Sequence, residues 1–166
     1  MGNPILEATR FLEKAVANPS QGLPDEVFYY ISRVTPMVNV DLLIKDEDNR
    51  TLLSWRDDKF ADKSWHIPGG IIRFKETFEE RLKKVAEIEI GIPVQFDPEP
   101  IAVNQIIVPE FDTRGHFISM LYKCFLPKSF IPENIGLTKD DQGFLEWHSS
   151  CPEHFYKYQD IYRPYL

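Results

Sequence analysis

The sequence lacks the features of a membrane, secreted or nucleic-acid-binding protein. No run in its 166 residues approaches the roughly 18–20 consecutive apolar residues that a transmembrane helix needs. Its two cysteines, Cys124 and Cys151, are too few for a disulfide framework. Positive charge is scarce, because 19 Lys and Arg oppose 26 Asp and Glu to give a net charge of −7. A chain without a basic excess does not suit a nucleic-acid backbone, so we expect neither nucleic acid nor membrane as a partner.

The N-terminus lacks the layout of a signal peptide, and we therefore expect a cytoplasmic location. The composition is that of a globular domain, with 43% hydrophobic and 27% charged residues. A chain this acidic would need a metal ion to receive a ligand that carries phosphate groups.

The hydrophobic periodicity predicts one mixed α/β domain that follows a short helical extension. We expect the extension to be residues 1–22 and the domain to be residues 23–166. The segments with helical spacing are residues 4–16, 24–33 and 75–90. The segments with strand character are residues 37–44, 50–56, 65–68, 100–108, 117–126 and 144–148. The aromatic tail at 154–165 is expected to pack back on the domain as a helix or strap.

Glu89 breaks the amphipathic pattern of the helix predicted at 75–90. With about 100° per residue, it falls about 20° from Phe78, inside the apolar stripe. A carboxylate there faces the interior and the negative end of the helix dipole, and both are unfavourable. Either Glu89 bends out to water or a cation neutralises it. The preceding Gly69-Gly70 lets a backbone group approach a ligand closely, and Mg²⁺ typically takes one or two carboxylates together with water and phosphate oxygens.

The spacing in this region resembles the Nudix box, whose usual form is G-x5-E-x7-R-E-U-x-E-E-x-G-U, where U is a bulky aliphatic residue. The positions that match are Gly70, Glu76, Ala86, Glu89, Gly91 and Ile92. The positions that differ are Lys84 in place of arginine, and Val85 and Ile88 in place of glutamates.

The same losses are typical of one Nudix subfamily, the GDP-mannose mannosyl hydrolases, and the resemblance to them extends over residues 23–149. It implies a Nudix α/β/α sandwich with a mixed sheet, a bound Mg²⁺ with Mn²⁺ as an alternative, and a homodimer. It also implies a nucleotide-sugar substrate. Water would attack the anomeric carbon of the sugar and release the nucleoside diphosphate.

The resemblance also implies roles for individual residues. The Gly69 carbonyl, Glu89 and Asp141 would bind the metal. Asp41 would help the diphosphate leave, and Arg56 would neutralise its charge. The motif residues with structural roles would be Gly70, Glu76, Lys84 and Gly91, with Glu76 and Lys84 forming an ion pair.

Two departures from the subfamily concern catalysis. Gln142 stands where the resemblance places a general-base histidine, and an amide cannot accept a proton at neutral pH. Asp141 or His116 could serve instead, or the protein is slow, or it only binds its ligand. Ile71 stands where an arginine would contact phosphate, and Arg73 is the nearby candidate. His66 is expected to have a structural or substrate-stacking role.

Two other functions therefore stay open at this point. One is ordinary Nudix pyrophosphohydrolase cleavage of a nucleotide derivative. The other is a catalytically impaired Nudix domain that binds a nucleotide sugar as a sensor or partner module.

Overall fold

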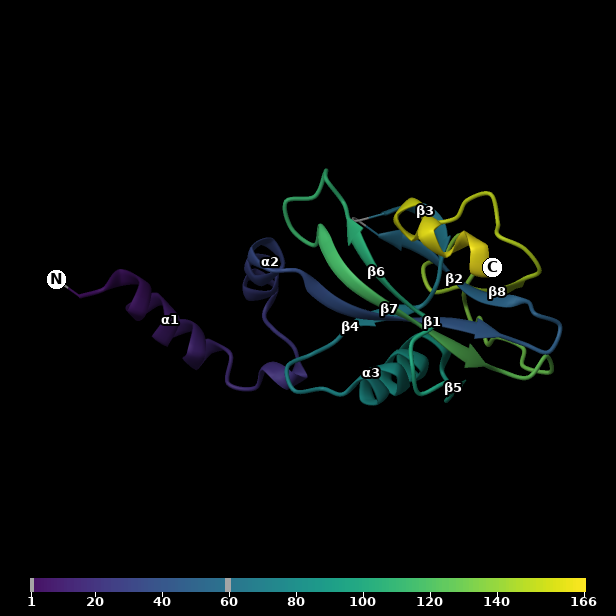
Figure 1. Ribbon diagram of the computed structural model, residues 1–166, viewed down its shortest axis with the longest axis horizontal. Helices are drawn as coiled ribbons and strands as arrows, with labels where there is room; N and C mark the ends of the chain where they lie inside the picture. The colour runs from purple at the N-terminus through teal and green to yellow at the C-terminus, as the bar shows by residue number, and fades with distance from the viewer. Residues whose placement is uncertain (1, 59–60) are drawn as a thin grey trace.

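A mixed sheet forms the centre of the protein in the computed structural model, which describes residues 2–58 and 61–166 (Figure 1). Over these residues eight strands pair in the order β3–β2–β1–β7–β5, while β4 also pairs with β1, β6 with β7, and β8 with β2. The strands are β1 (Met37–Lys45), β2 (Thr51–Asp58), β3 (Ala61–His66), β4 (Gly69–Ile71), β5 (Gln95–Phe96), β6 (Ala102–Ile107), β7 (His116–Phe125) and β8 (Leu145–His148). The predicted α/β class is confirmed, although the sequence did not indicate β4 and β5.

Strand β1 lies at the centre of the strand order and pairs with three other strands. It runs parallel to β7 along its whole length and antiparallel to β2 and β4. The register places Asp41 opposite Gly69 of β4 and opposite Leu121 of β7. Successive residues of a strand point to opposite faces, so the odd-numbered residues of β1 share one face with Asp41.

The two faces of the sheet bury two separate apolar clusters. Helix α3 (Phe78–Val85) covers one face, where Leu82 packs with Val40 and Tyr122. The C-terminal tail covers the other face with a 3₁₀ helix, η3 (Lys157–Tyr165), and its Tyr162 is fully buried beside Leu121 (Figure 1). The sheet therefore lies between helices, as in the predicted α/β/α sandwich.

Helix α3 begins three residues later than the periodicity predicts. Lys75 has a left-handed φ of 59°, and Thr77 then caps the helix in a reciprocal capping box with Glu80. The helix ends in a π-helical turn, η2 (Ala86–Ile90), and Gly91 with φ of 84° stops it. A π-helical turn is frequent at functional sites, and this one carries Glu89.

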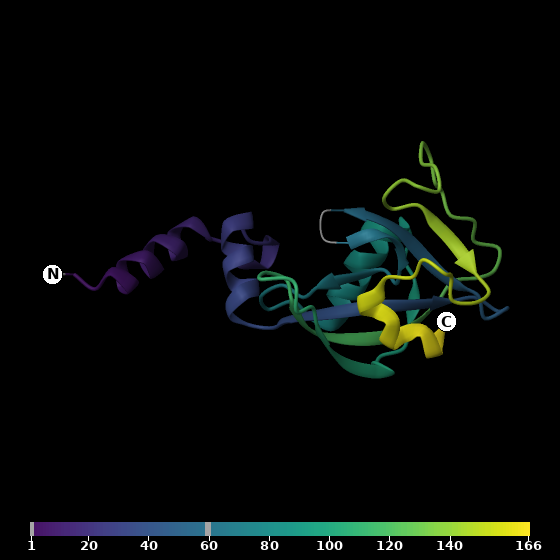
Figure 2. The same cartoon turned by 90° about the horizontal axis from the view of Figure 1, so that it is seen from above.

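The N-terminal segment stands apart from the sheet. Helix α1 (Pro4–Ala15) contains no buried residue and projects away from the body in both views (Figures 1 and 2). A 3₁₀ turn, η1 (Pro19–Gln21), connects it to α2 (Asp25–Val34), which lies at the start of β1. The amphipathic helix predicted at residues 4–16 is present, but its apolar stripe does not pack on the domain. In the described part of the chain, no helix is long and apolar enough to cross a membrane.

Candidate active site

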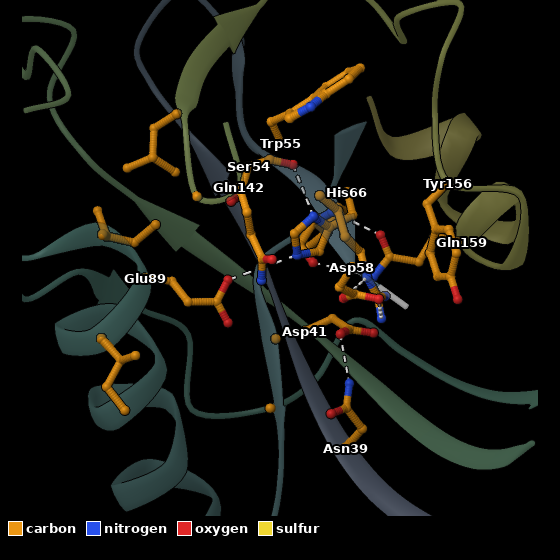
Figure 3. A pocket seen from close by; sticks show the side chains of 18 of the residues that line it. Asn39, Asp41, Ser54, Trp55, Asp58, His66, Glu89, Gln142, Tyr156 and Gln159 are labelled. Carbon is orange, nitrogen blue, oxygen red and sulfur yellow. Dashed lines mark hydrogen bonds and ion pairs between the residues drawn. The ribbon is translucent and has the colours of Figure 1, made fainter. Parts of the chain in front are cut away.

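A cavity of about 930 Å³ opens where β1, β4 and the π-helical turn meet the loop between β6 and β7 and the C-terminal tail. Most of the site residues expected from the sequence line it. They are Asp41, Arg56, His66, Gly69, Gly70, Glu89, Gly91 and Gln142. Figure 3 shows Glu89 on one side of this pocket and Tyr156 on the opposite side, with Asp41 and Asp58 between them.

Asp41 lies at the floor of the cavity with almost no exposed surface. Its carboxylate accepts hydrogen bonds from Asn39 Nδ2 at 2.7 Å, from Tyr162 Oη at 2.7 Å and from Ser119 Oγ. Burial raises the pKa of Asp41, and these three donors oppose the rise, which leaves the pKa at about 6. Asp41 is thus ionised at neutral pH and held in one position.

Glu89 points from the π-helical turn into the cavity, as Figure 3 shows. Of the two alternatives that the sequence left open, the structure therefore does not show Glu89 bending away from the domain. Its Oε2 lies 3.9 Å from His66 Nε2. Burial raises the pKa of Glu89 most; a backbone hydrogen bond from Gly69 and the charge of Arg56 lower it, and the charge of Asp41 raises it, to a pKa of about 8. Without a cation, this carboxyl is mostly protonated at neutral pH.

His66 is a neutral imidazole whose tautomer follows from its surroundings. Its Nδ1 lies 2.9 Å from the carbonyl oxygen of Ser54, which can only accept, so Nδ1 carries the proton. Burial and the charge of Arg56 lower the pKa of His66 to about 4. The lone pair of Nε2 therefore faces Glu89.

Gly69 is required by the close approach of β4 to β1. A Cβ atom at this position would collide with Asp41 Oδ1 and lie 2.8 Å from the carbonyl oxygen of Val40. Any other residue would displace the Asp41 carboxylate or the strand, so the Gly69-Gly70 entry is a packing requirement as well as a motif.

Arg56 carries positive charge into the middle of the cavity. Its guanidinium is bound by Asp58, with Nε 2.7 Å from Oδ2, and lies 4.8 Å from the ring centroid of Tyr156. Gln142 comes from the loop before β8, and Figure 3 shows its amide directed toward Glu89 and His66. The cavity thus contains the carboxyl groups of Asp41 and Glu89 together with a guanidinium that Asp58 holds in place.

Three expected site residues lie outside the lining of this cavity. The Asp141 carboxylate closes a turn by accepting hydrogen bonds from the backbone N–H and the hydroxyl of Thr138, at 2.7 and 2.8 Å. Arg73 donates to the carbonyl oxygen of Gln21 at 2.5 Å. His116 pairs with Gln105 across β6 and β7, with 2.9 Å between the two Nε2 atoms. The structure thus does not bring these three residues into the lining of the cavity, and each has a partner outside it.

The motif residues Glu76 and Lys84 form the ion pair expected from the resemblance, at 2.9 Å. Arg81, which the motif did not indicate, is the closer partner at 2.5 Å, and the Glu76 side chain is 4% exposed. Burial alone would raise the pKa of Glu76, but hydrogen bonds from the Arg73 backbone, Lys84 and Arg81 lower it to about 2. This cluster fixes the loop between β4 and α3.

The C-terminal tail supplies site residues that sequence reasoning missed. Tyr162 donates to Asp41, while Gln159 bonds both the N–H and the carbonyl of Ile67, at 2.8 and 3.2 Å. Tyr156 and Tyr158 line the cavity. The richness of the tail in tyrosine was the available signal, because such side chains often have one apolar and one hydrogen-bonded end.

The acidic side of the cavity fits a divalent cation of the kind that takes most of its ligands from water and substrate. Asp41 and Glu89 face one cavity, and the charge of Asp41 adds to the burial that raises the pKa of Glu89; a bound cation would lower that pKa again. Among residues 2–58 and 61–166, no three His, Cys, Asp or Glu side chains cluster as a complete metal cage. Such a cage is not needed for Mg²⁺, which usually keeps several waters.

The fold and this motif define a Nudix protein, and comparison with known families gives the same answer. The NUDIX domain family matches residues 35–163, so the chain belongs to the Nudix family. Nudix hydrolases generally use a divalent metal such as Mg²⁺ and act on small nucleotide substrates.

Individual relatives are more distant. The chain is 34% identical over 79 residues to the low-salt glycan biosynthesis protein Agl8 of Haloferax volcanii, a match that covers 48% of this chain and half of that protein. A possible asymmetric diadenosine tetraphosphate hydrolase from Jonesia denitrificans superposes with a TM-score of 0.57 and 21% identity, over 77% of this chain and 90% of that one. The MutT protein of Methanosarcina mazei gives a TM-score of 0.57 and 17% identity, over 80% and 91%. The two solved structures support the fold alone.

Proposed function

We propose that this Nudix protein is a Mg²⁺-dependent hydrolase of a nucleoside diphosphate sugar such as GDP-mannose, and that it releases the sugar and the nucleoside diphosphate. The observation that carries the proposal is that the buried Asp41 carboxylate, the half-buried Glu89 carboxyl and the Arg56 guanidinium line one cavity of about 930 Å³. This arrangement complements a diphosphate that is bridged to the protein by a cation on one side and bound by a guanidinium on the other.

Two further features support the sugar-linked substrate over other nucleotides. The Nudix box retains Glu89 but has Val85 and Ile88 at the positions of two other glutamates, and Ile88 is 74% exposed. A Nudix box with one inward carboxylate can hold few metal ions. It therefore fits a reaction in which the metal only neutralises the diphosphate better than a reaction in which several metals act at phosphorus. The relative from Haloferax volcanii is named for glycan biosynthesis, which agrees with a substrate that contains a sugar.

The proposed reaction uses the residues of this chain in three roles. Glu89, with the Gly69 carbonyl, would hold Mg²⁺, which when bound stabilises negative charge on the diphosphate and so improves the leaving group. Arg56 would bind the diphosphate oxygens from the other side, because Asp58 and Tyr156 already hold its guanidinium in place. Asp41 would orient the departing diphosphate and the groups around it.

Activation of water is assigned to the one histidine of the four that lines the cavity. His66 is neutral and its Nε2 lone pair points to the cavity, whereas Gln142 has no basic atom. The pKa of about 4 makes His66 a weak base, so we expect slow turnover. Water would give its proton to His66 Nε2 as its oxygen bonds to the anomeric carbon, and the carbon–oxygen bond to the diphosphate would break. Gln142 would then serve to position the water by accepting from it or donating to it.

The test is incubation with Mg²⁺ and a panel of nucleotide sugars in ¹⁸O-labelled water, followed by mass analysis of the products. Label in the released sugar would support attack at carbon. Label in a phosphate group would replace the proposal by pyrophosphohydrolase cleavage. Tight binding of one nucleotide sugar without turnover of any would replace it by a binding role.

A further inference from the structure

The cavity continues past Arg56 into an aromatic end. Arg56 Cζ lies 4.8 Å from the ring centroid of Tyr156, which lies 5.4 Å from that of Tyr158, which in turn lies 6.1 Å from that of Phe111. All three rings line the cavity and are partly exposed. Figure 3 shows Tyr156 on the side of the pocket opposite Glu89. A ligand that places its phosphates near Glu89 and Arg56 therefore extends its next group among these rings.

Arg114 supplies a second guanidinium at this end. It lines the cavity from the loop between β6 and β7, and its charge interacts with those of Arg56 and Asp58 and with Tyr156. Helix α2 fixes its position, because its backbone N–H donates to Ser32 Oγ at 3.1 Å and its Cζ lies 5.6 Å from the ring centroid of Phe28. Its left-handed backbone, with φ of 57°, is held by these contacts.

The tail fixes the same loop from its other side. Lys157 Nζ lies 3.0 Å from Glu110 Oε1, and the Tyr158 hydroxyl donates to the same carboxylate. The loop that carries Phe111 and Arg114 is therefore anchored both to α2 and to the tail. Rings and a guanidinium that are held in place lose little conformational entropy when a ligand binds.

We propose that the base of the nucleotide binds at this aromatic end, stacked against the rings of Phe111, Tyr156 and Tyr158, with the Arg114 guanidinium donating to a carbonyl oxygen of the base. Stacking on aromatic rings accepts any base, so the selection comes from Arg114. A guanidinium only donates, and it pairs well with O6 and N7 of guanine or O4 of uracil. It would oppose the N6 amino group of adenine, which has no carbonyl oxygen. The site thus selects a keto base, and guanine gains more from stacking than uracil.

This inference rests on the proposed function for the identity of the ligand as a nucleotide, but binding alone tests it. Calorimetric titration in the presence of Mg²⁺ compares GDP, UDP, ADP and inorganic pyrophosphate on the full chain. We expect GDP to bind about tenfold or more tightly than either ADP or pyrophosphate, with UDP between. Arg114→Met and Phe111→Leu should each lower the affinity for GDP by about tenfold and change the affinity for pyrophosphate by less than about twofold.

Two further variants complete the design. Arg33→Met removes an exposed arginine of α2 and should change the affinity for neither GDP nor pyrophosphate. Arg114→Lys keeps the charge and removes the planar fork, so it should weaken GDP and spare pyrophosphate. Equal affinity for GDP, ADP and pyrophosphate would overturn the proposal, as would a common loss of GDP and pyrophosphate in Arg114→Met, which would place Arg114 on phosphate. A protein that binds GDP as described but hydrolyses no nucleotide sugar would support this inference and contradict the hydrolase proposal.

Discussion

The two ends of the cavity are encoded differently. The acidic end is built by neighbours in the sheet and by one helix, since the β1–β4 register sets Asp41 against Gly69 and the π-helical turn brings in Glu89. The aromatic end joins the loop after β6 to the C-terminal tail, through contacts such as that between Phe111 and Tyr158. A spacing motif can therefore find the first end, whereas the second depends on where a distant segment packs.

The largest expected effect concerns the acidic end. Glu89→Gln keeps the shape of the side chain and removes its charge, so we expect at least about a 100-fold loss of Mg²⁺-dependent turnover. Mg²⁺ titration by calorimetry should show the weakened binding directly. Glu87→Gln, an exposed glutamate of the same turn, is the matched control and should behave as wild type. Unchanged Mg²⁺ affinity in Glu89→Gln would remove this residue from the metal site.

The next effect is on stability and tests the support behind the acidic end. Glu76→Gln leaves Arg81 buried without its carboxylate, so we expect a loss of about 3 kcal/mol in the free energy of unfolding at pH 7. The sign follows from the pKa of Glu76, which is about 2 in the fold and near 4.5 when unfolded. This stabilisation is complete above pH 4.5 and is lost as the pH falls toward 2.

Urea unfolding of wild type and Glu76→Gln from pH 7 to pH 3 measures this contribution. The difference between the two curves should shrink on acidification. Glu79→Gln breaks only the exposed pair with Lys83, where both side chains are more than 60% exposed, and should cost under about 1 kcal/mol. An equal cost for the two substitutions would show that the buried cluster does not support the loop before α3.

Arg56 tests the centre of the cavity, where the two ends meet. Arg56→Met removes the guanidinium that we place on the diphosphate and should raise KM or lower kcat/KM by about 10- to 100-fold. Arg73→Met changes the arginine that the sequence offered for the same role but that bonds Gln21 outside the cavity. It should change kcat/KM by less than about twofold, as measured with the nucleotide sugar that the labelling experiment selects. The opposite ranking would mean that the loop of Arg73 moves onto the substrate.

The same contrast describes how far sequence reasoning reached. Periodicity and motif spacing predicted the mixed α/β fold and the main strands and placed Glu89 within the apolar stripe of its helix, because these depend on contacts that are local or repeated. They did not predict that the Asp141 carboxylate accepts hydrogen bonds from Thr138, because neither pattern shows that a four-residue turn keeps this carboxylate out of the cavity. Nor did they predict Tyr162 beside Asp41, because that contact joins residues 121 positions apart. The homodimer stays a prediction. The apolar stripe of α1 remains exposed, with Ile5 at 76% and Phe11 at 71%.

The smallest expected effect concerns Tyr162, which links the two ends of the cavity. It belongs to the C-terminal tail, and its hydroxyl donates to Asp41. Tyr162→Phe removes one of three donors that oppose the rise caused by burial, so the pKa of Asp41 should move above its present value of about 6. A higher pH is then needed to ionise Asp41, and the acid limb of the pH–rate profile should shift upward. We expect about a three- to tenfold loss of kcat/KM at pH 6 and little loss at pH 8. Tyr165→Phe removes a hydroxyl from the same tail at a more exposed position and serves as the control. A uniform loss at all pH values in Tyr162→Phe would instead indicate that the tail only positions the sheet, and that Asp41 does not need its hydrogen bond to stay ionised.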